Sequence, residues 1–374
     1  MKNQRNKITF LKKIFLFLFF CFVNSIIFAQ DCKDIVQRAE IAYKKGHLND
    51  VKEILTDECI NVLPLKEEKE RAYYLLVLSN LYLKDLEAAK VMMLKILHQN
   101  PEYVCDPTSP VAFQKFYNSF KSTPFIILGA KIGGNFSQIQ STKIYSLDDF
   151  KTSQNGTFQS LPGINMQASA MIPIYKKFEL VLEVGFKQYN YSFKNRQFDY
   201  SSILFKERQN LIEMPVLAKY NFGNNYNFKI RYKNFWQSLN PYVIAGVSAT
   251  YLLSSKSTIQ REDKLVNSSI SINSPEFNTK SMRNAFSFYA VGGVGLDYKK
   301  GRAIFSIEGR YHYGFSPIIK SNARYDNQEM LLTYGYVDSD IKFRNLMVTI
   351  GYAIPIYRPK QMREFFADEI GDKK

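Results

Sequence analysis

The sequence predicts a mainly β protein with a small all-α domain, in which an eight-stranded antiparallel transmembrane β-barrel follows a pair of helical hairpins. Three observations predict this fold. Apolar and polar residues alternate along several segments, the connections between these segments are alternately short and long, and the chain begins with a leader for export. The clearest strand is 178–193, FELVLEVGFKQYNYSF. Because successive side chains of a strand point to opposite faces, one face of this segment is apolar and the other carries charge. An apolar outer face around a polar interior is typical of a membrane barrel.

Residues 1–29 predict a secretory signal peptide. A basic segment, 2–13, precedes the apolar run IFLFLFFCFV at 14–23, and Ala29 ends a plausible cleavage site before Gln30. The alternative is an uncleaved membrane anchor, for which the apolar run is short. An exported chain of this kind is either soluble outside the cytoplasm, for example as a β-sandwich, or a barrel.

The charge balance does not indicate a nucleic-acid partner. Lys and Arg number 50 against 34 Asp and Glu, which gives a net charge of +16. Part of this excess lies in the predicted leader, and the remaining basic residues are dispersed along the chain. A nucleic-acid-binding protein gathers its basic residues on one face or in a known motif. We therefore expect no nucleic-acid binding.

Residues 30–105 predict a helical domain of two hairpins. Apolar residues recur at helical spacing in four segments, and stop signals such as Gly46 and Pro101 separate or end them. The four segments are 31–45, 48–60, 65–84 and 86–99. The pattern resembles tetratricopeptide repeats through Ala39, Tyr43, Gly46, Ser79, Tyr82, Ala89, Met93, Ile96 and Pro101. The resemblance implies a concave surface that binds a periplasmic or outer-membrane protein partner through residues 31–105.

Three cysteines remain after the predicted leader: Cys32, Cys59 and Cys105. If the first two helices are antiparallel, Cys32 lies at the start of the hairpin and Cys59 at its end. The start and the end of the hairpin then lie next to each other, and the two cysteines with them. We predict a Cys32–Cys59 disulfide, as an oxidising compartment permits. The alternative is two buried free thiols. Residues 106–123, with a short helical stretch at 111–120, are expected to link this domain to the barrel.

The barrel is expected over residues 124–357. Its predicted strands are 124–137, 160–174, 177–193, 209–222, 239–254, 284–299, 301–315 and 343–355. Tight turns at 175–177 and 299–301 alternate with connections of roughly 15 to 30 residues. Outer-membrane barrels have short periplasmic turns and longer outside loops, and an even strand number leaves both termini in the periplasm. The helical domain and the tail 358–374 are therefore predicted there. The long link 222–240 departs from the rule, either as an extra hairpin or as a partner contact.

The polar face of these strands carries charges that would be buried in a barrel. In an eight-stranded barrel the interior is just filled by side chains, and a buried charge must be paired. We predict an interior ion-pair network rather than catalytic acid–base pairs, and no wide pore. Its members are Lys131, Glu179, Glu183, Lys187, Glu213, Lys219, Glu308 and Arg310.

Three segments carry a resemblance to a known family: FIILGAKIGGNFS at 125–137, IEMPVLAKYNF at 212–222 and NPYVIAGVSATYLL at 240–253. They resemble the Bacteroidota outer-membrane β-barrel proteins of the PorT-like type. The resemblance covers about residues 124–357 and implies a barrel in contact with outer-membrane lipid. The family includes a protein needed for type IX secretion. The helical domain and the charged tail depart from the family pattern.

No motif of catalysis, cofactor binding or metal binding occurs in the sequence. The function we expect is a non-enzymatic outer-membrane barrel that anchors a periplasmic helical interaction module, as an accessory of envelope secretion or assembly. One alternative is a narrow channel or uptake component. The other is an outer-membrane lipid hydrolase, for which His312 and Ser306 are the candidate base and nucleophile.

Overall fold

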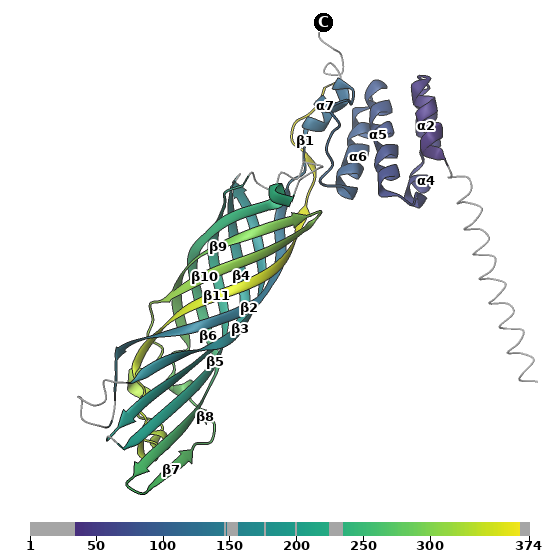
Figure 1. The fold of residues 1–374 in the computed structure, drawn as a ribbon. Helices are drawn as coiled ribbons and strands as arrows, with labels where there is room; N and C mark the ends of the chain where they lie inside the picture. Colours follow the sequence, from purple (N-terminus) through teal and green to yellow (C-terminus); the bar gives the residue numbers. More distant parts are fainter. Residues whose placement is uncertain are drawn as a thin grey trace, which may run out of the picture. The chain divides into compact units, whose positions relative to one another are not determined.

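The computed structural model describes residues 34–145, 147, 156–175, 177–198, 200–223 and 235–366. The predicted signal peptide, Cys32 and residues 224–234 of the long link lie outside the described residues. The chain forms two compact units, drawn in Figure 1. Among the described residues, the helical unit comprises 34–123 and 357–366, and the barrel unit lies within Pro124–Ile356.

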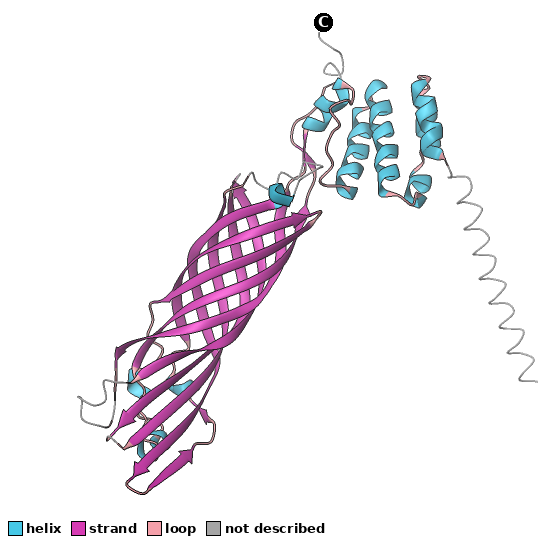
Figure 2. Cartoon of the chain, in the orientation of Figure 1, coloured by secondary structure: helices cyan, strands magenta, loops and turns pink. Residues whose placement is uncertain are grey.

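The helical unit contains short helices packed around one apolar core. They are α2 (Ile35–Lys44), α3 (Leu48–Ile54), α4 (Asp57–Val62), α5 (Lys66–Tyr82), α6 (Leu86–Gln99) and α7 (Val111–Asn118), drawn in cyan in Figure 2. Asp85 caps α6, and its side chain accepts a hydrogen bond from the backbone N–H of Ala88 at 3.2 Å. Within the described part of the chain, no helix is long and apolar enough to cross a membrane.

The single helix predicted over 48–60 is wrong, because the structure divides it into α3 and α4. Thr56 between them has extended backbone angles, with φ −73° and ψ 150°. Its side chain accepts a hydrogen bond from the backbone N–H of Cys59 at 3.4 Å, so it starts a new helix. Threonine is a favoured N-cap, which explains why the helix restarts at this residue.

The predicted linker 106–123 and the tail after residue 357 are both part of the helical unit. Helix α7 buries Phe113 and Phe116 in the core of that unit. Strand β1 (Phe120–Lys121) pairs antiparallel with β12 (Lys360–Gln361). Phe365 then lies edge-on to Phe116, with ring centroids 5.1 Å apart. The apolar spacing in α7 makes it amphipathic, so it packs instead of crossing solvent as a linker.

The cysteines of the helical unit differ in state. Cys59 is a disulfide cysteine, whereas Cys105 carries a free thiol whose pKa is raised by burial. Because Cys32 lies outside the described residues, the Cys32–Cys59 pairing stays a prediction.

The barrel unit is built from long antiparallel strands. They are β2 (Pro124–Lys143), β3 (Thr157–Tyr175), β4 (Phe178–Gln197), β5 (Ser201–Asn221), β6 (Leu239–Leu265), β9 (Phe286–Lys300), β10 (Ala303–Gly314) and β11 (Asp340–Tyr357). Hydrogen-bonded neighbours follow the order β5-β4-β3-β2-β11-β10-β9-β6, and β6 also pairs with β5. Two short strands, β7 (Ser268–Asn273) and β8 (Phe277–Asn278), pair with β6. Each predicted strand segment overlaps one of the long strands.

The prediction of a long connection between the third and fourth strands is wrong. Strands β4 and β5 continue to residues 197 and 201, so only residues 198–200 join them. Phe193 and Phe205 lie opposite each other in this extension, and both are buried. The alternation of buried and exposed residues continues through the extension, because its inner face packs against apolar side chains. We call the end of the barrel at which β4 ends and β5 begins the distal end.

The connection between β10 and β11 fills the distal end. It contains η4 (Ser321–Ala323) and α8 (Gln328–Leu332). Its buried side chains, among them Met330 and Tyr334, belong to the same apolar cluster as the inner residues of the strands. The ring of Tyr336 stacks on Phe205 with centroids 4.1 Å apart and an angle of 7°. Two further 3-10 turns, η2 (Phe235–Ser238) and η3 (Lys280–Met282), flank β6 and β9.

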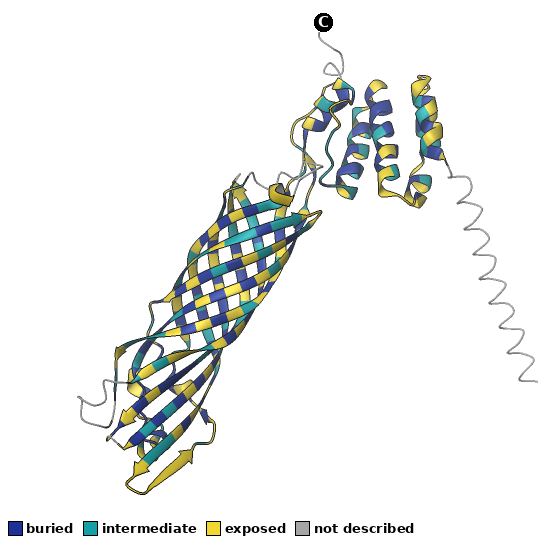
Figure 3. Ribbon diagram, in the orientation of Figure 1, coloured by how far each residue is buried: buried dark blue, intermediate teal, exposed yellow. Residues whose placement is uncertain are grey.

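Burial in the barrel unit is the reverse of that in a water-soluble sheet. Along β4, Glu179, Glu183 and Lys187 are buried, whereas Leu182 and Val184 are 39% and 52% exposed. The alternation of dark blue and yellow along the long strands of the barrel in Figure 3 shows the same arrangement. An apolar outer belt exposed to the surroundings would be unfavourable in water, and it is the surface that a lipid bilayer requires.

Candidate functional site: the barrel interior

The inward-facing residues gather their charges into four clusters along the barrel. The first cluster is Glu179, Lys219 and Asp297; the second is Lys131, Glu183, Glu308 and Arg310; the third is Lys187, Glu213 and His312; the fourth is Glu207, Arg283 and Asp338. Every one of these side chains is buried. All eight residues predicted for the interior network lie in the first three clusters.

The first cluster is held by one lysine from β5. The Nζ atom of Lys219 lies 2.5 Å from Asp297 Oδ2 and 3.6 Å from Glu179 Oε2. The same ammonium group lies 4.0 Å from the ring centroid of Tyr242, a cation–π distance. A single lysine thus faces two carboxylates and one aromatic ring, which compensates part of its lost hydration.

The second cluster joins four charges from β2, β4 and β10. Arg310 donates two parallel hydrogen bonds to Glu183, at 2.5 and 2.7 Å, and a third to Glu308. Lys131 Nζ bridges the same two carboxylates at 2.9 and 3.1 Å. The hydroxyl of Tyr242 donates to Glu308 at 2.7 Å. Two cations therefore balance two anions, and the two-point arginine contact fixes their geometry.

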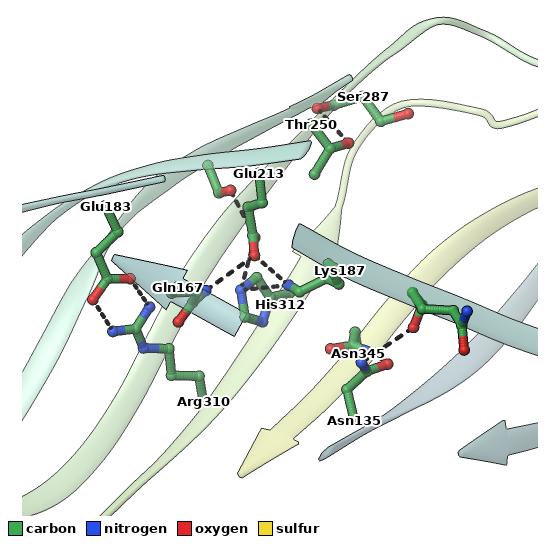
Figure 4. A network of polar contacts seen from close by, with 12 residues as sticks. Asn135, Gln167, Glu183, Lys187, Glu213, Thr250, Ser287, Arg310, His312 and Asn345 are labelled. Atoms are coloured by element: carbon green, nitrogen blue, oxygen red, sulfur yellow. Dashed lines mark hydrogen bonds and ion pairs between the residues drawn. The ribbon is translucent and has the colours of Figure 1, made fainter. Parts of the chain in front are cut away.

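The third cluster surrounds Glu213, as Figure 4 shows. Lys187 Nζ lies 2.6 Å from Glu213 Oε2, and His312 Nε2 lies 3.1 Å from Oε1. Ser248 and Gln167 donate further hydrogen bonds to the carboxylate, at 2.8 and 3.4 Å. The carboxylate thus has four polar partners, which is the saturation that a buried charge needs.

The fourth cluster lies toward the distal end and was not predicted. Arg283 forms two-point contacts with Glu207 at 2.7 and 2.8 Å and with Asp338 at 2.6 and 3.0 Å. Tyr191 donates to Glu207 at 2.6 Å, and Tyr336 donates to Asp338 at 3.2 Å. All three charged residues lie just outside the predicted strands. The signal that could have found Glu207 is the alternation that continues through residues 201–207 of β5.

The pair proposed for hydrolysis is not assembled by the structure. Ser306 and His312 lie six residues apart in β10, which is about 20 Å along an extended strand. A nucleophile and its base must lie within hydrogen-bond reach. His312 Nε2 instead contacts Glu213. Among the described residues, no group of three or more His, Cys, Asp or Glu side chains could hold a metal ion.

The space between the first two clusters is small. A cavity of about 10 Å³ lies between the first two clusters, lined by residues that include Lys131, Lys219 and Tyr242. That volume accommodates about one water molecule. The arrangement can therefore hold charge in place, and this cavity is too small for a substrate.

A family model described as "Outer membrane protein beta-barrel domain" matches residues 125–320. No curated protein matches the chain. Similar solved structures include the surface protein NspA of Neisseria, with 12% identity over 63% of this chain and 99% of that chain (TM-score 0.28). OprG of Pseudomonas aeruginosa has 13% identity over 64% and 99% (TM-score 0.36). The protease OmpT of Escherichia coli has 12% identity over 63% and 98% (TM-score 0.28). These values are too low to support an inference about activity.

Proposed function

Because the chain belongs to the family of outer membrane protein β-barrel domains, we propose that its barrel is a non-enzymatic anchor for a periplasmic, protein-binding helical unit. The proposal comprises an eight-stranded barrel, both termini in the periplasm, and a tetratricopeptide-like helical surface. The motif at 212–222 supports a PorT-like relationship, and with it an accessory role in envelope secretion or assembly of the type IX kind.

The observation that carries the proposal is the filled interior. Four ion-paired clusters and the packed connection 315–339 occupy the barrel, and the cavity between the first two clusters measures about 10 Å³. A conducting channel needs a continuous water-filled path, and a hydrolase needs a nucleophile beside a base. The interior of the described barrel favours neither a channel nor a hydrolase. A barrel of this kind fixes a second unit at the membrane, so we place the specific activity in the helical unit.

The helical unit offers a surface suited to a protein partner. Tyr43 of α2 hydrogen-bonds to Tyr82 of α5, and Tyr43 and Tyr74 are half-buried against the core of the helical unit. Burial raises the pKa of Tyr43 to about 12, so this group stays neutral at physiological pH. Tyr82 is 46% exposed. Tyrosines with an apolar ring and a polar tip are enriched where proteins bind partners. We call Tyr43, Tyr74 and Tyr82 the tyrosine face.

Tyr82→Ala is expected to reduce, at least tenfold, the amount of a partner protein that co-purifies from outer membranes in mild detergent. Loss of one central aromatic anchor costs about 2 kcal/mol, which exceeds a tenfold change in affinity. The matched control is Val91→Ala in α6, because Val91 is 48% exposed and lies outside the tyrosine face. Equal losses for the two variants, or no partner with the unaltered protein, would contradict the proposed role. A deletion of residues 31–105 is less informative, since it removes the core against which α7 packs.

A further inference from the structure

The outward faces of β4, β5 and β6 carry a group of cations just beyond the apolar belt, toward the distal end. We propose that this group binds the anionic, phosphate-bearing headgroup of an outer-membrane lipid. We call it the basic patch, and its residues are Lys194, Lys206, Arg208 and Lys256. All four residues are exposed. The proposal concerns lipid, and so goes beyond the protein-binding role proposed for the helical unit.

The strand register brings these cations together. Arg208 of β5 lies directly opposite Lys256 of β6. Lys206 lies two residues from Arg208 on the same face, and Lys194 of β4 lies opposite Leu204, diagonally next to Lys206. Cβ atoms of opposite residues lie about 5 Å apart, and like charges placed in this way destabilise a sheet. An anion between the strands would remove that repulsion.

The counter-charge supplied by the protein is small. Glu276 lies 2.5 Å from Lys256 Nζ and offsets one of the four cations. Within the described residues, Lys194, Lys206 and Arg208 have no ion-pair partner. The basic patch ends at Ser202 of β5. On either side of Ser202 lie Arg196 of β4 and Glu262 of β6, which carry opposite charges. The patch therefore keeps an excess of positive charge that an external anion can neutralise.

The depth of the basic patch matches the headgroup layer. On β5 the outward apolar run that includes Met214 and Ile212 is interrupted by Asn210 and then Arg208. Four residues of a strand tilted by about 40° rise about 10 Å along the membrane normal. The headgroup layer extends about 5–8 Å beyond the hydrocarbon, and long basic side chains reach back toward it. The charged ends of the patch can therefore reach lipid phosphates.

The chemistry of the patch favours a phosphate-bearing lipid over a soluble anion. An arginine flanked by lysines suits phosphate, because the guanidinium forms two-point hydrogen bonds and the ammonium groups add charge. The apolar side chains directly below, such as Ile212 and Met214, would contact the acyl chains of the same molecule. Only a lipid satisfies both surfaces at once.

The test is lipid retention measured by native mass spectrometry on the full protein in a neutral detergent. The probe is short-chain phosphatidic acid, compared with phosphatidylcholine and inorganic phosphate. We expect Lys194→Gln/Lys206→Gln/Arg208→Gln to lower the affinity for phosphatidic acid at least tenfold. The matched control, Lys143→Gln/Lys264→Gln/Lys300→Gln, removes three exposed cations elsewhere and should leave it unchanged. Added salt should weaken the binding of the unaltered protein, because exposed charges are screened.

Several outcomes would overturn the proposal. One is an equal loss of affinity for phosphatidic acid in the two triple variants. Another is retention of phosphatidylcholine as strong as that of phosphatidic acid. A third is displacement of phosphatidic acid by inorganic phosphate at the same concentration. Loss of a co-purifying acidic protein, with lipid binding unchanged, would overturn it as well. Arg208→Gln alone gives a second measurement that changes a single exposed side chain, and we expect a smaller loss in the same direction.

Discussion

Arg310→Met should lower the free energy of unfolding by about 3–5 kcal/mol, because it removes one partner of a buried ion cluster. In the second cluster Arg310 makes three hydrogen bonds to Glu183 and Glu308. Without it, Lys131 alone must balance two buried carboxylates. The measurement is a urea titration of the protein folded in lipid vesicles, with the folded fraction read from its heat-dependent gel shift.

A variant that removes the whole second cluster is the control for this prediction. Lys131→Met, Glu183→Leu, Glu308→Leu and Arg310→Met together leave no unpaired charge in that cluster. Replacement of a complete buried ion cluster by apolar residues is often close to neutral, so this variant should be more stable than Arg310→Met. If Arg310→Met costs less than about 1 kcal/mol, or if the fourfold variant is the less stable, the ion pairs are not what holds the interior.

Phe365→Ala should destabilise the helical unit by about 3 kcal/mol, although the residue lies far from it in sequence. Phe365 is 6% exposed and packs edge-on against Phe116 of α7. Loss of a buried phenylalanine removes its apolar contacts and leaves a cavity. Hydrogen exchange of the backbone amides in residues 34–118 measures the effect, with the amides of the barrel strands as an internal reference.

The neighbouring residue provides the control for Phe365→Ala. Phe366 is 60% exposed, so Phe366→Ala should change the protection of the helical unit by less than about 1 kcal/mol. Equal protection in the two variants would show that the tail does not complete the core. Truncation after Arg358 removes β12 and Phe365 together, and should cost at least as much as Phe365→Ala.

The sequence predicts the polar interior because the strand period is simple. Side chains alternate strictly, so Glu179, Glu183 and Lys187 had to share a face opposite the apolar residues between them. The identity of their partners could not be predicted in the same way. Lys131 bridges Glu183 and Glu308 across 52 and 177 residues of sequence, which depends on register and on the order of strands around the sheet.

The elements that sequence reasoning missed are held by distant contacts. Residues 194–197 and 201–208 contain Lys, Arg, Asn and Ser, which are typical of a loop, yet they form strands because their inner face packs against the connection 315–339. The fourth cluster depends on that packing, since Arg283 and Asp338 lie outside the long strands. Likewise, the tail after residue 357 has a charged, loop-like composition, yet Phe365 and the pairing with β1 join its described part to the helical unit.

The most direct test of a filled, anchoring barrel is single-channel conductance of the full protein in a planar lipid bilayer. The ion clusters and the cavity of about 10 Å³ between the first two of them predict no steady conductance steps above the bilayer background. Steady steps of uniform size would contradict the account, because they require a continuous aqueous path through the interior.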